Sequence, residues 1–185
     1  MRTYITLAIF IVIALGSFWF LQNLNKQTVI DKKIDDHFPD YFMDDFTITN
    51  LDKKGQPEYV LHAKKMQHYS DDDKAELIQP FLKFAQNGTF LTLNASRAIY
   101  LKQDNLIYLH DNVIIHRAAS KTQTELFIYT DYLKINTLAR IAETDRAAKI
   151  KTPDAELNTI GLILDSIQGT VILQSQVKGT YEATH

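Results

Sequence analysis

The chain has 185 residues, which fits one domain with a short appended element, and it contains no cysteine. The lack of cysteine excludes a disulfide framework and thiol chemistry. The formal net charge of −2 argues against binding to nucleic-acid backbones, because such binding requires a basic face.

An uncharged apolar segment opens the chain. It covers Tyr4–Leu21, and its apolar character continues to Leu24. At 1.5 Å per residue this segment would make a helix about 27 Å long, close to the thickness of the hydrocarbon core of a bilayer. Arg2 precedes it, so the positive-inside rule places the N-terminus in the cytoplasm and the remainder outside. We therefore predict a transmembrane signal-anchor over residues 1–24.

A cleaved signal peptide is the alternative for this segment, with its best cleavage site at 14–16. The apolar run continues through Phe18 to Leu21, beyond that site, which favours an uncleaved anchor. Residues 25–40 are polar and form a linker, and Pro39 ends any helix there. Residues 41–185 are the predicted exported domain, and without the first 24 residues the chain has a net charge of −3.

Alternating apolar residues predict strands throughout the domain. Phe46 and Ile48 mark the first strand, and Tyr59 to Ala63 form the second. Glu76–Phe84 is a third strand, which Pro80 either kinks or places near an edge. Further short strands are predicted at 91–95, 106–109, 113–115, 125–129, 132–135, 139–144, 147–151, 156–164 and 170–178. Many short strands at near-regular spacing indicate a sandwich, roll or barrel.

The stretch Leu91–Ile115 carries a pattern that recurs along the chain. Its Ala95-x-x-Ala98-x-Tyr100 motif aligns with Thr130-x-x-Leu133-x-Ile135 and, more loosely, with residues 63–68. Such units bury their apolar face by stacking on their neighbours. Some strands, most clearly residues 106–109, are apolar on both faces. They either line an apolar cavity or pack in a tight sandwich core, and composition leaves both readings open.

Motifs for catalysis are missing. The sequence has no nucleophile elbow, no P-loop, no dinucleotide fingerprint and no zinc-protease motif. His62 and His68 are six residues apart, a spacing more typical of surface histidines than of a metal site. We expect no enzyme activity, no metal and no cofactor. An anchored periplasmic hydrolase remains an alternative that would require clustered carboxylates in a pocket.

Several short motifs, in this order and spacing, resemble the LptC family of the lipopolysaccharide-export bridge. They lie at 45–49, 55–63, 66–71, 79–80, 95–113, 129–136, 161–162 and 177–181, and together with the N-terminal anchor they cover nearly the whole chain. One departure is His110-Asp111, which stands where the family repeat commonly has a glycine.

The resemblance implies an all-β fold, a twisted antiparallel β-jellyroll with an open V-shaped slot that follows one transmembrane helix. It implies a single-pass protein of the inner membrane that accepts lipopolysaccharide from the LptB-LptF-LptG transporter and passes it to LptA. A structural adaptor, or another lipid-binding periplasmic module without ligand transfer, is the alternative.

Candidate slot residues are selected by two criteria, their alternation along each predicted strand and the resemblance. The residues are Phe46, Ile48, Tyr59, Leu61, Leu77, Phe81, Leu93, Ala98, Tyr100, Leu106, Tyr108, Val113, Leu133 and Val171. Two edges are expected to pair with neighbouring jellyrolls, the first with LptF/LptG and the second with LptA. The edge residues are Phe46, Ile48 and Leu51, and then Val171, Leu173, Val177 and Tyr181.

Overall fold

A computed structural model describes residues 17–20, 38–86, 89–121 and 123–182. Residues 17–20 are helical, and the rest of the predicted anchor over 1–24 lies outside the described residues. Within the described part of the chain no helix has the length and apolar character needed to cross a bilayer. The chain from Phe38 to His185 is one compact unit, and it is described here by itself.

The described part of this unit is all β, as predicted, and forms a single sheet with eleven strands. The strands are β1 (Tyr41–Leu51), β2 (Pro57–Tyr69), β3 (Lys74–Ile78), β4 (Phe81–Gln86), β5 (Thr89–Asn94), β6 (Arg97–Leu101), β7 (Leu106–Arg117), β8 (Leu126–Asn136), β9 (Ile141–Lys151), β10 (Ala155–Asp165) and β11 (Thr170–Tyr181).

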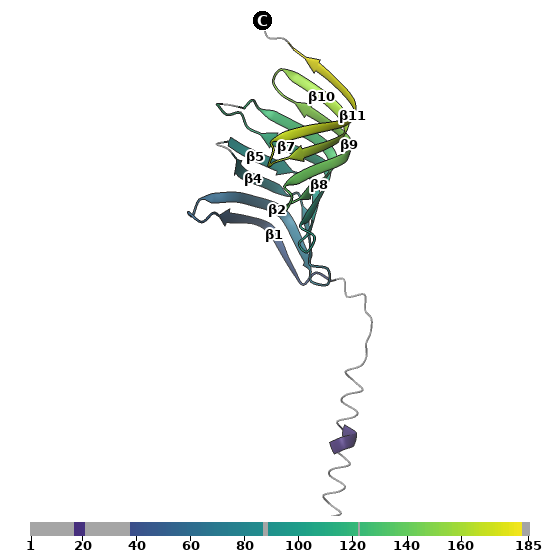
Figure 1. Cartoon of the computed structure of the whole chain (residues 1–185). Coiled ribbons are helices and arrows are strands. Elements are labelled where there is room, and N and C mark those ends of the chain that lie inside the picture. The colour runs from purple at the N-terminus through teal and green to yellow at the C-terminus, as the bar shows by residue number, and fades with distance from the viewer. Residues whose placement is uncertain (1–16, 21–37, 87–88, 122, 183–185) are drawn as a thin grey trace, which may run out of the picture. The chain divides into compact units, whose positions relative to one another are not determined.

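All pairings are antiparallel between neighbours. The short strands β3 and β4 both pair with β2, one with each half of it. Likewise β6 and β5 pair with the two halves of β7. In the described chain β1 pairs only with β2 and β11 only with β10, so these two strands are the edges of the sheet (Figure 1).

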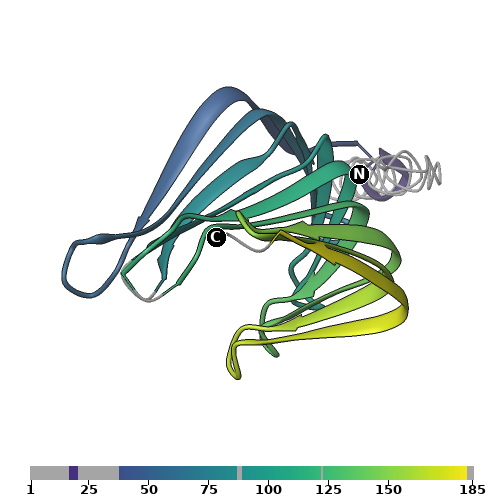
Figure 2. The same cartoon turned by 90° about the horizontal axis from the view of Figure 1, so that it is seen from above.

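A crease crosses the long strands of the sheet near their middle and passes between β3 and β4 and between β5 and β6. Figure 2 shows the strands bent back on themselves, so that the two halves of the sheet form the arms of a V. The crease passes through Asp45 in β1, Gln79-Pro80 between β3 and β4, Asp111-Asn112 in β7, Gly161 in β10 and Gln176 in β11. Buried side chains from both arms form one core.

Backbone conformation marks the crease. Positive φ occurs at Asp45 (43°), Gln79 (50°), Asp111 (61°), Asn112 (53°), Gly161 (83°) and Gln176 (50°). The other described residues with positive φ lie in the turns that join strands. Glycine, asparagine and aspartate adopt this left-handed region most readily, which explains their frequency at these positions. It also explains Asp111, which stands where the family repeat has a glycine.

Buried threonines satisfy backbone groups that the crease removes from the strand ladder. Thr130 Oγ1 donates to the carbonyl oxygen of Ala147 at 3.0 Å, and Thr159 Oγ1 donates to that of Ser175 at 3.0 Å. The hydroxyl of Thr144 accepts from the N–H of Arg146 at 3.1 Å. An intramolecular hydrogen bond contributes about 0.5–1.5 kcal/mol, so these hydroxyls stabilise the bend.

The crease also corrects some predicted strand limits. The gaps left between predicted strands at 110–112, 130–131 and 145–146 are bends within β7, β8 and β9, not turns between separate strands. Of the two alternatives for Pro80, the kink is the one observed, because β3 ends and β4 begins on either side of it and neither strand is at an edge.

Candidate functional site: an apolar inner face between two free edges

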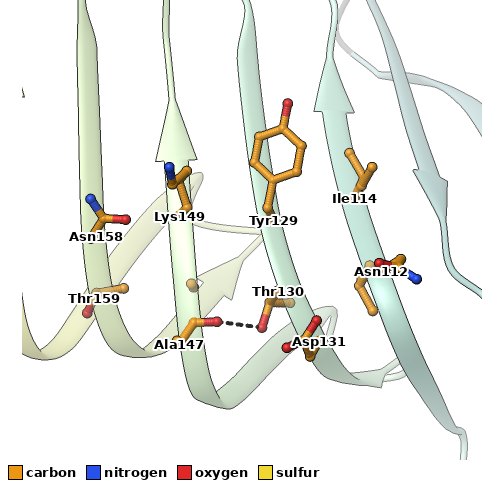
Figure 3. A pocket seen from close by; sticks show the side chains of 11 residues that line it. Asn112, Ile114, Tyr129, Thr130, Asp131, Ala147, Lys149, Asn158 and Thr159 are labelled. Atoms are coloured by element: carbon orange, nitrogen blue, oxygen red, sulfur yellow. Dashed lines mark hydrogen bonds between the residues drawn. The ribbon is translucent and has the colours of Figure 1, made fainter.

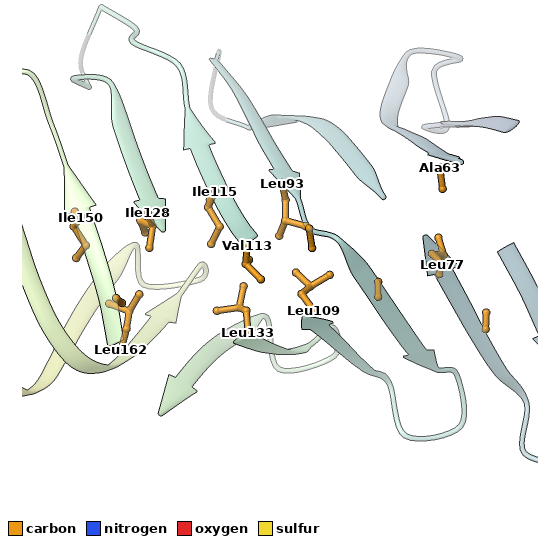
Figure 4. Packing of buried hydrophobic residues seen from close by; sticks show 14 of the residues in the cluster. Ala63, Leu77, Leu93, Leu109, Val113, Ile115, Ile128, Leu133, Ile150 and Leu162 are labelled. Carbon is orange, nitrogen blue, oxygen red and sulfur yellow. The ribbon is translucent and has the colours of Figure 1, made fainter. Parts of the chain in front are cut away.

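The inner face of the V carries the apolar core. Leu109, Val113, Ile128, Leu133 and Leu162 are its largest fully buried side chains. Figure 4 shows Leu109 and Leu133 on one arm pointing toward Leu93, Val113 and Ile115 on the other. The register places these residues on one face, because Leu109 lies opposite Leu133, and Leu93 lies opposite Ile115. The middle of the inner face is therefore closed by packing.

Eleven of the fourteen predicted slot residues lie on the inner face, according to the register and the crease. They are Phe46, Ile48, Tyr59, Leu61, Leu77, Leu93, Ala98, Tyr100, Val113, Leu133 and Val171. Leu77, Leu93, Ala98, Val113 and Leu133 are buried core residues. The others lie toward the periphery of the same face, so the structure brings the set together as one apolar surface.

Leu106 and Tyr108 are corrections, because they lie on the outer face. They alternate with Ile107 and Leu109, whose side chains pack into the core. Tyr108 lies opposite Lys134, and its ring is 6.4 Å from the ring of Tyr132. Residues 106–109 are all apolar, so the sequence did not distinguish the two faces here.

Phe81 is the third correction. It lies opposite His62 and Asn94, is 41% exposed and belongs to the outer face, whereas Leu82 packs against the core. Phe81 follows Leu77 by four residues, and this even spacing predicted that both side chains lie on the inner face. The left-handed residue Gln79 shifts the alternation between β3 and β4, so this parity does not carry across the crease.

Sequence reasoning missed several inner-face residues. They include Met43, Met66, Leu82, Leu91, Ile107, Leu109, Ile115, Ile128, Ile135, Ile150, Leu157, Leu162 and Leu164. The alternation at the end of β8 was visible in the sequence, and following it from Leu133 would have found Ile135, whereas Ile128 lies an odd number of residues away, beyond the bend in β8. Met43 and Met66 could not be found that way, because each is separated by a crease from the residues that share its face.

The inner face becomes exposed toward both ends of the sheet. At the β1 end Ile48 is 38% exposed and Tyr59 is 37% exposed, and at the β11 end Val171 is 46% exposed. The predicted edge residues lie on these two edge strands, Phe46, Ile48 and Leu51 on β1 and Val171, Leu173, Val177 and Tyr181 on β11. Apolar surface beside unpaired strand backbone is suited to extension of the sheet by another protein.

Two hollows lie on the outer side of the crease and not in the apolar core. One, of about 380 Å³, is lined by polar side chains such as Asn112, Asp131 and Lys149 together with apolar ones such as Ile114 and Ala147 (Figure 3). The other, of about 440 Å³, lies beside Asp111, Asp145 and Arg146. Neither offers the continuous apolar surface that an acyl chain would need. Within the described residues no group of three or more His, Asp or Glu side chains is placed to hold a metal ion.

His68 joins the start of β1 to the β2–β3 turn. Its Nδ1 is 2.8 Å from Asp40 Oδ1, and its Nε2 is 3.1 Å from Asp73 Oδ1. The hydrogen bond to Asp40 is the main cause that raises the pKa of His68, burial opposes it, and Asp73 contributes further. Tyr41 stacks on the ring at 4.6 Å. His68 therefore links the segment before β1 to the β2–β3 turn, whereas its sequence spacing predicted a surface histidine.

The family model described as "Lipopolysaccharide-assembly, LptC-related" matches residues 7–182. The chain belongs to the LptC family. LptC-family membership gives it a role in lipopolysaccharide transport. No curated protein matches the sequence.

Among solved structures the LptC-family chain is similar to LptH of Pseudomonas aeruginosa, described as the LptA-homologous periplasmic component of the conserved lipopolysaccharide transport device. The TM-score is 0.47 at 8% sequence identity, and the match covers 77% of this chain and 94% of LptH.

Proposed function

We propose that this chain is the inner-membrane-anchored member of the lipopolysaccharide bridge, which accepts lipopolysaccharide from LptB-LptF-LptG and hands it to LptA. One observation carries the proposal: an apolar inner face becomes exposed at both of the free edges of one sheet. Exposure of a buried acyl methylene to water costs about 0.8 kcal/mol, so a carrier needs continuous apolar surface. Joining a jellyroll to each edge would extend that surface.

Each edge has one partner in this proposal. β1 joins the periplasmic jellyroll of LptF or LptG, and β11 is the docking site for LptA. The chain then needs no cofactor and performs no chemistry, because ATP is hydrolysed by LptB. Residues 1–24 anchor it in the inner membrane, residues 25–40 are the linker, and the jellyroll lies in the periplasm.

Photo-crosslinking in vesicles that contain the transporter and ATP tests the transfer of lipopolysaccharide. A photoreactive residue at Ile48 or Val171, exposed on the inner face, is expected to give a lipopolysaccharide adduct that depends on ATP. Tyr108 is the matched control, because it is an aromatic residue of the outer face. Equal labelling at Tyr108 and Ile48, or no adduct at any inner-face position, would contradict the transfer role.

A structural adaptor without ligand transfer is the second candidate, and the closed middle of the inner face favours it. Leu109 and Val113 pack there with 2% or less of their surface exposed. Passage of an acyl chain would require the two arms to separate at this point. A photoreactive residue at Leu109 distinguishes the two functions: an adduct with ATP supports transfer, whereas adducts at the two ends but never at Leu109 support the adaptor.

The anchor is tested by fractionation of cells that express the full chain. We expect it in the inner-membrane fraction after a carbonate wash, and we expect a secreted version that lacks residues 1–24 in the soluble periplasmic fraction. A full chain that the wash removes would contradict a membrane-spanning segment.

A further inference from the structure

Arg117 is a charged residue on the inner face of the sheet, at the end of β7. The residues before it at every second position, Val113 and Ile115, are buried in the core, so alternation places Arg117 on the same face. The register places it opposite Leu91 of β5 and Leu126 of β8, which both pack against the core. Arg117 is half-buried, so apolar side chains flank a permanent positive charge.

No acidic residue pairs with Arg117 in the part of the chain that the structure describes. β5 contains no Asp or Glu, and the acids of β7 and β8, Asp111 and Asp131, lie at the crease and line an outer hollow. Glu125, in the loop after β7, lies 2.8 Å from His116 Nε2 instead. Every other Lys or Arg of the described strands lies on the outer face, so Arg117 is an isolated cation on an apolar surface.

The donors of the Arg117 guanidinium are poorly satisfied. Nη2 donates to the carbonyl oxygen of Thr124 at 3.4 Å, which is long for such a bond, and Nε is buried without a hydrogen-bond partner among the described residues. A guanidinium carries five N–H donors in one planar fork and no acceptor. Burial of a charged donor without a partner is unfavourable, so this fork favours a ligand that can accept hydrogen bonds from it.

Arg117 lies at the open end of its arm and not beside the crease. At about 3.3 Å per residue it is about 13 Å along β7 from Val113, where packing closes the middle of the inner face. Strand pairing aligns it in one row with Leu91, Phe84 and Tyr59, so the inner surface beside it is apolar. An amphiphile that directs its apolar chains toward the crease would therefore bring its polar head to Arg117.

An acidic oxygen group is the polar head that this position matches. Two N–H groups of a guanidinium match two oxygens of a phosphate or a carboxylate, an arrangement that lysine does not offer. The loop after β7 adds the exposed Lys121 and has no acidic residue before Glu125, so the local charge is positive. In lipopolysaccharide the phosphate groups are on the sugars that bear the acyl chains, so phosphate is the anion next to the apolar part of the molecule.

We propose that Arg117 binds a phosphate group of lipopolysaccharide at the open end of the inner face, with the acyl chains on the apolar surface between Arg117 and the crease. This inference rests on the proposed function, in which lipopolysaccharide passes along the inner face. It adds the orientation of the ligand and the residue that recognises its phosphorylated sugars.

Binding of two forms of the ligand tests this role. The full-length chain in non-ionic detergent carries a photoreactive residue at Tyr59, which lies in the same row as Arg117 and is 37% exposed. It is titrated with lipopolysaccharide and with lipopolysaccharide from which the phosphates have been removed, and the adduct yield gives the apparent Kd of each. The parent chain is expected to bind the phosphorylated form roughly tenfold more tightly, because charge-assisted hydrogen bonds are strong.

Arg117→Gln should remove this preference by raising the Kd of the phosphorylated form roughly tenfold and leaving that of the phosphate-free form unchanged. Arg97→Gln is the matched control, because Arg97 lies on the outer face and pairs with Asp111 at 3.3 Å, and it should change neither Kd. An equal loss of affinity for both forms in Arg117→Gln would overturn the proposal, since Arg117 would then act by supporting the loop through Thr124.

Arg117→Lys is a second variant that keeps the charge without the fork, and it decides the question if Arg117→Gln does not fold. Its Kd for the phosphorylated form should lie between those of the parent chain and of a variant without the charge. Melting temperatures show whether each variant is folded. A folded Arg117→Lys that lost the same factor of affinity for both forms would overturn phosphate recognition.

Free phosphate is the other source of the same anion, and inorganic phosphate alone distinguishes it. Arg117 would be a site for free phosphate if inorganic phosphate raised the melting temperature of the parent chain but not of Arg117→Gln, while both forms of lipopolysaccharide bound equally. That result would overturn the proposal and leave the proposed function intact. If the parent chain gave no adduct with either form, the proposed function would fail as well.

Discussion

A Cβ atom on Gly161 would lie 2.9 Å from the Cβ atom of Gln174 on the neighbouring strand. Gly161 also has a φ of +83°, which places it in the left-handed region. Both conditions oppose any other residue here, one by contact and one by backbone strain. The crease in β10 therefore depends on this glycine.

We expect Gly161→Ala to lower the free energy of unfolding by about 2–4 kcal/mol, the sum of strain and steric overlap. Urea denaturation followed by circular dichroism measures it. Gly169→Ala is the control: its φ is +67°, but a Cβ atom there would meet nothing within 4 Å. It should cost only about 1–2 kcal/mol of strain. Equal losses for the two variants would show that Gln174 does not restrict Gly161.

His68 should make the stability of the domain depend on pH. Its pKa is raised in the folded state, chiefly by the hydrogen bond to Asp40, from an ordinary value of 6.5. Only protonated His68 can donate to Asp40 and Asp73 together. Its stabilising contribution is therefore fully present below about pH 6.5 and is lost as the pH rises through the raised pKa.

Denaturation at several pH values between 5 and 9 tests this prediction. The parent domain should lose stability across the window, relative to His68→Gln, and the two curves should converge at high pH. His62→Gln is the control, since the hydrogen-bond partner of His62 Nδ1 is the hydroxyl of Thr47, at 3.2 Å, and not a carboxylate. A pH profile of His68→Gln parallel to that of the parent would remove His68 as the cause.

Alternation in the sequence was enough to predict an all-β domain and most of its inner face, because every second residue of a strand points the same way. It failed where a left-handed residue shifts the alternation, as Gln79 does before Phe81. It also failed where both faces are apolar, as at Leu106 and Tyr108. The closure of the middle of the face could not be predicted, because it depends on how far the two arms are bent together.

Truncation of a leucine on each face tests the corrected assignment. Leu133 is fully buried in the core, and we expect Leu133→Ala to destabilise the domain by about 2–5 kcal/mol. Leu106, which lies opposite Leu101 and Asn136 on the outer face, is the control. Leu106→Ala should cost about 1 kcal/mol or less, because partly exposed leucines bury less apolar area. A larger loss for Leu106→Ala in urea denaturation would reverse the assignment.

The threonine hydroxyls at the crease should contribute to stability out of proportion to their size. Thr159 is 3% exposed, and its Oγ1 lies 3.0 Å from the carbonyl oxygen of Ser175 and 3.1 Å from that of Gly161. Thr159→Val keeps the volume and the branched shape but removes the donor. We expect a loss of about 1–3 kcal/mol, because the carbonyl oxygen of the buried residue Gly161 loses a hydrogen bond.

Thr49→Val is the matched control for this change, since Thr49 is an exposed residue of the edge strand β1. It should alter the free energy of unfolding by about 0.5 kcal/mol or less. A large loss for Thr159→Val and a small one for Thr49→Val would show that the crease depends on the buried hydroxyl and not on the strand propensity of threonine. If Thr159→Val were as stable as the parent, the bend in β10 would be held by Gly161 and packing alone, and amide exchange at Ser175 and Gln176 should be as slow as in the parent.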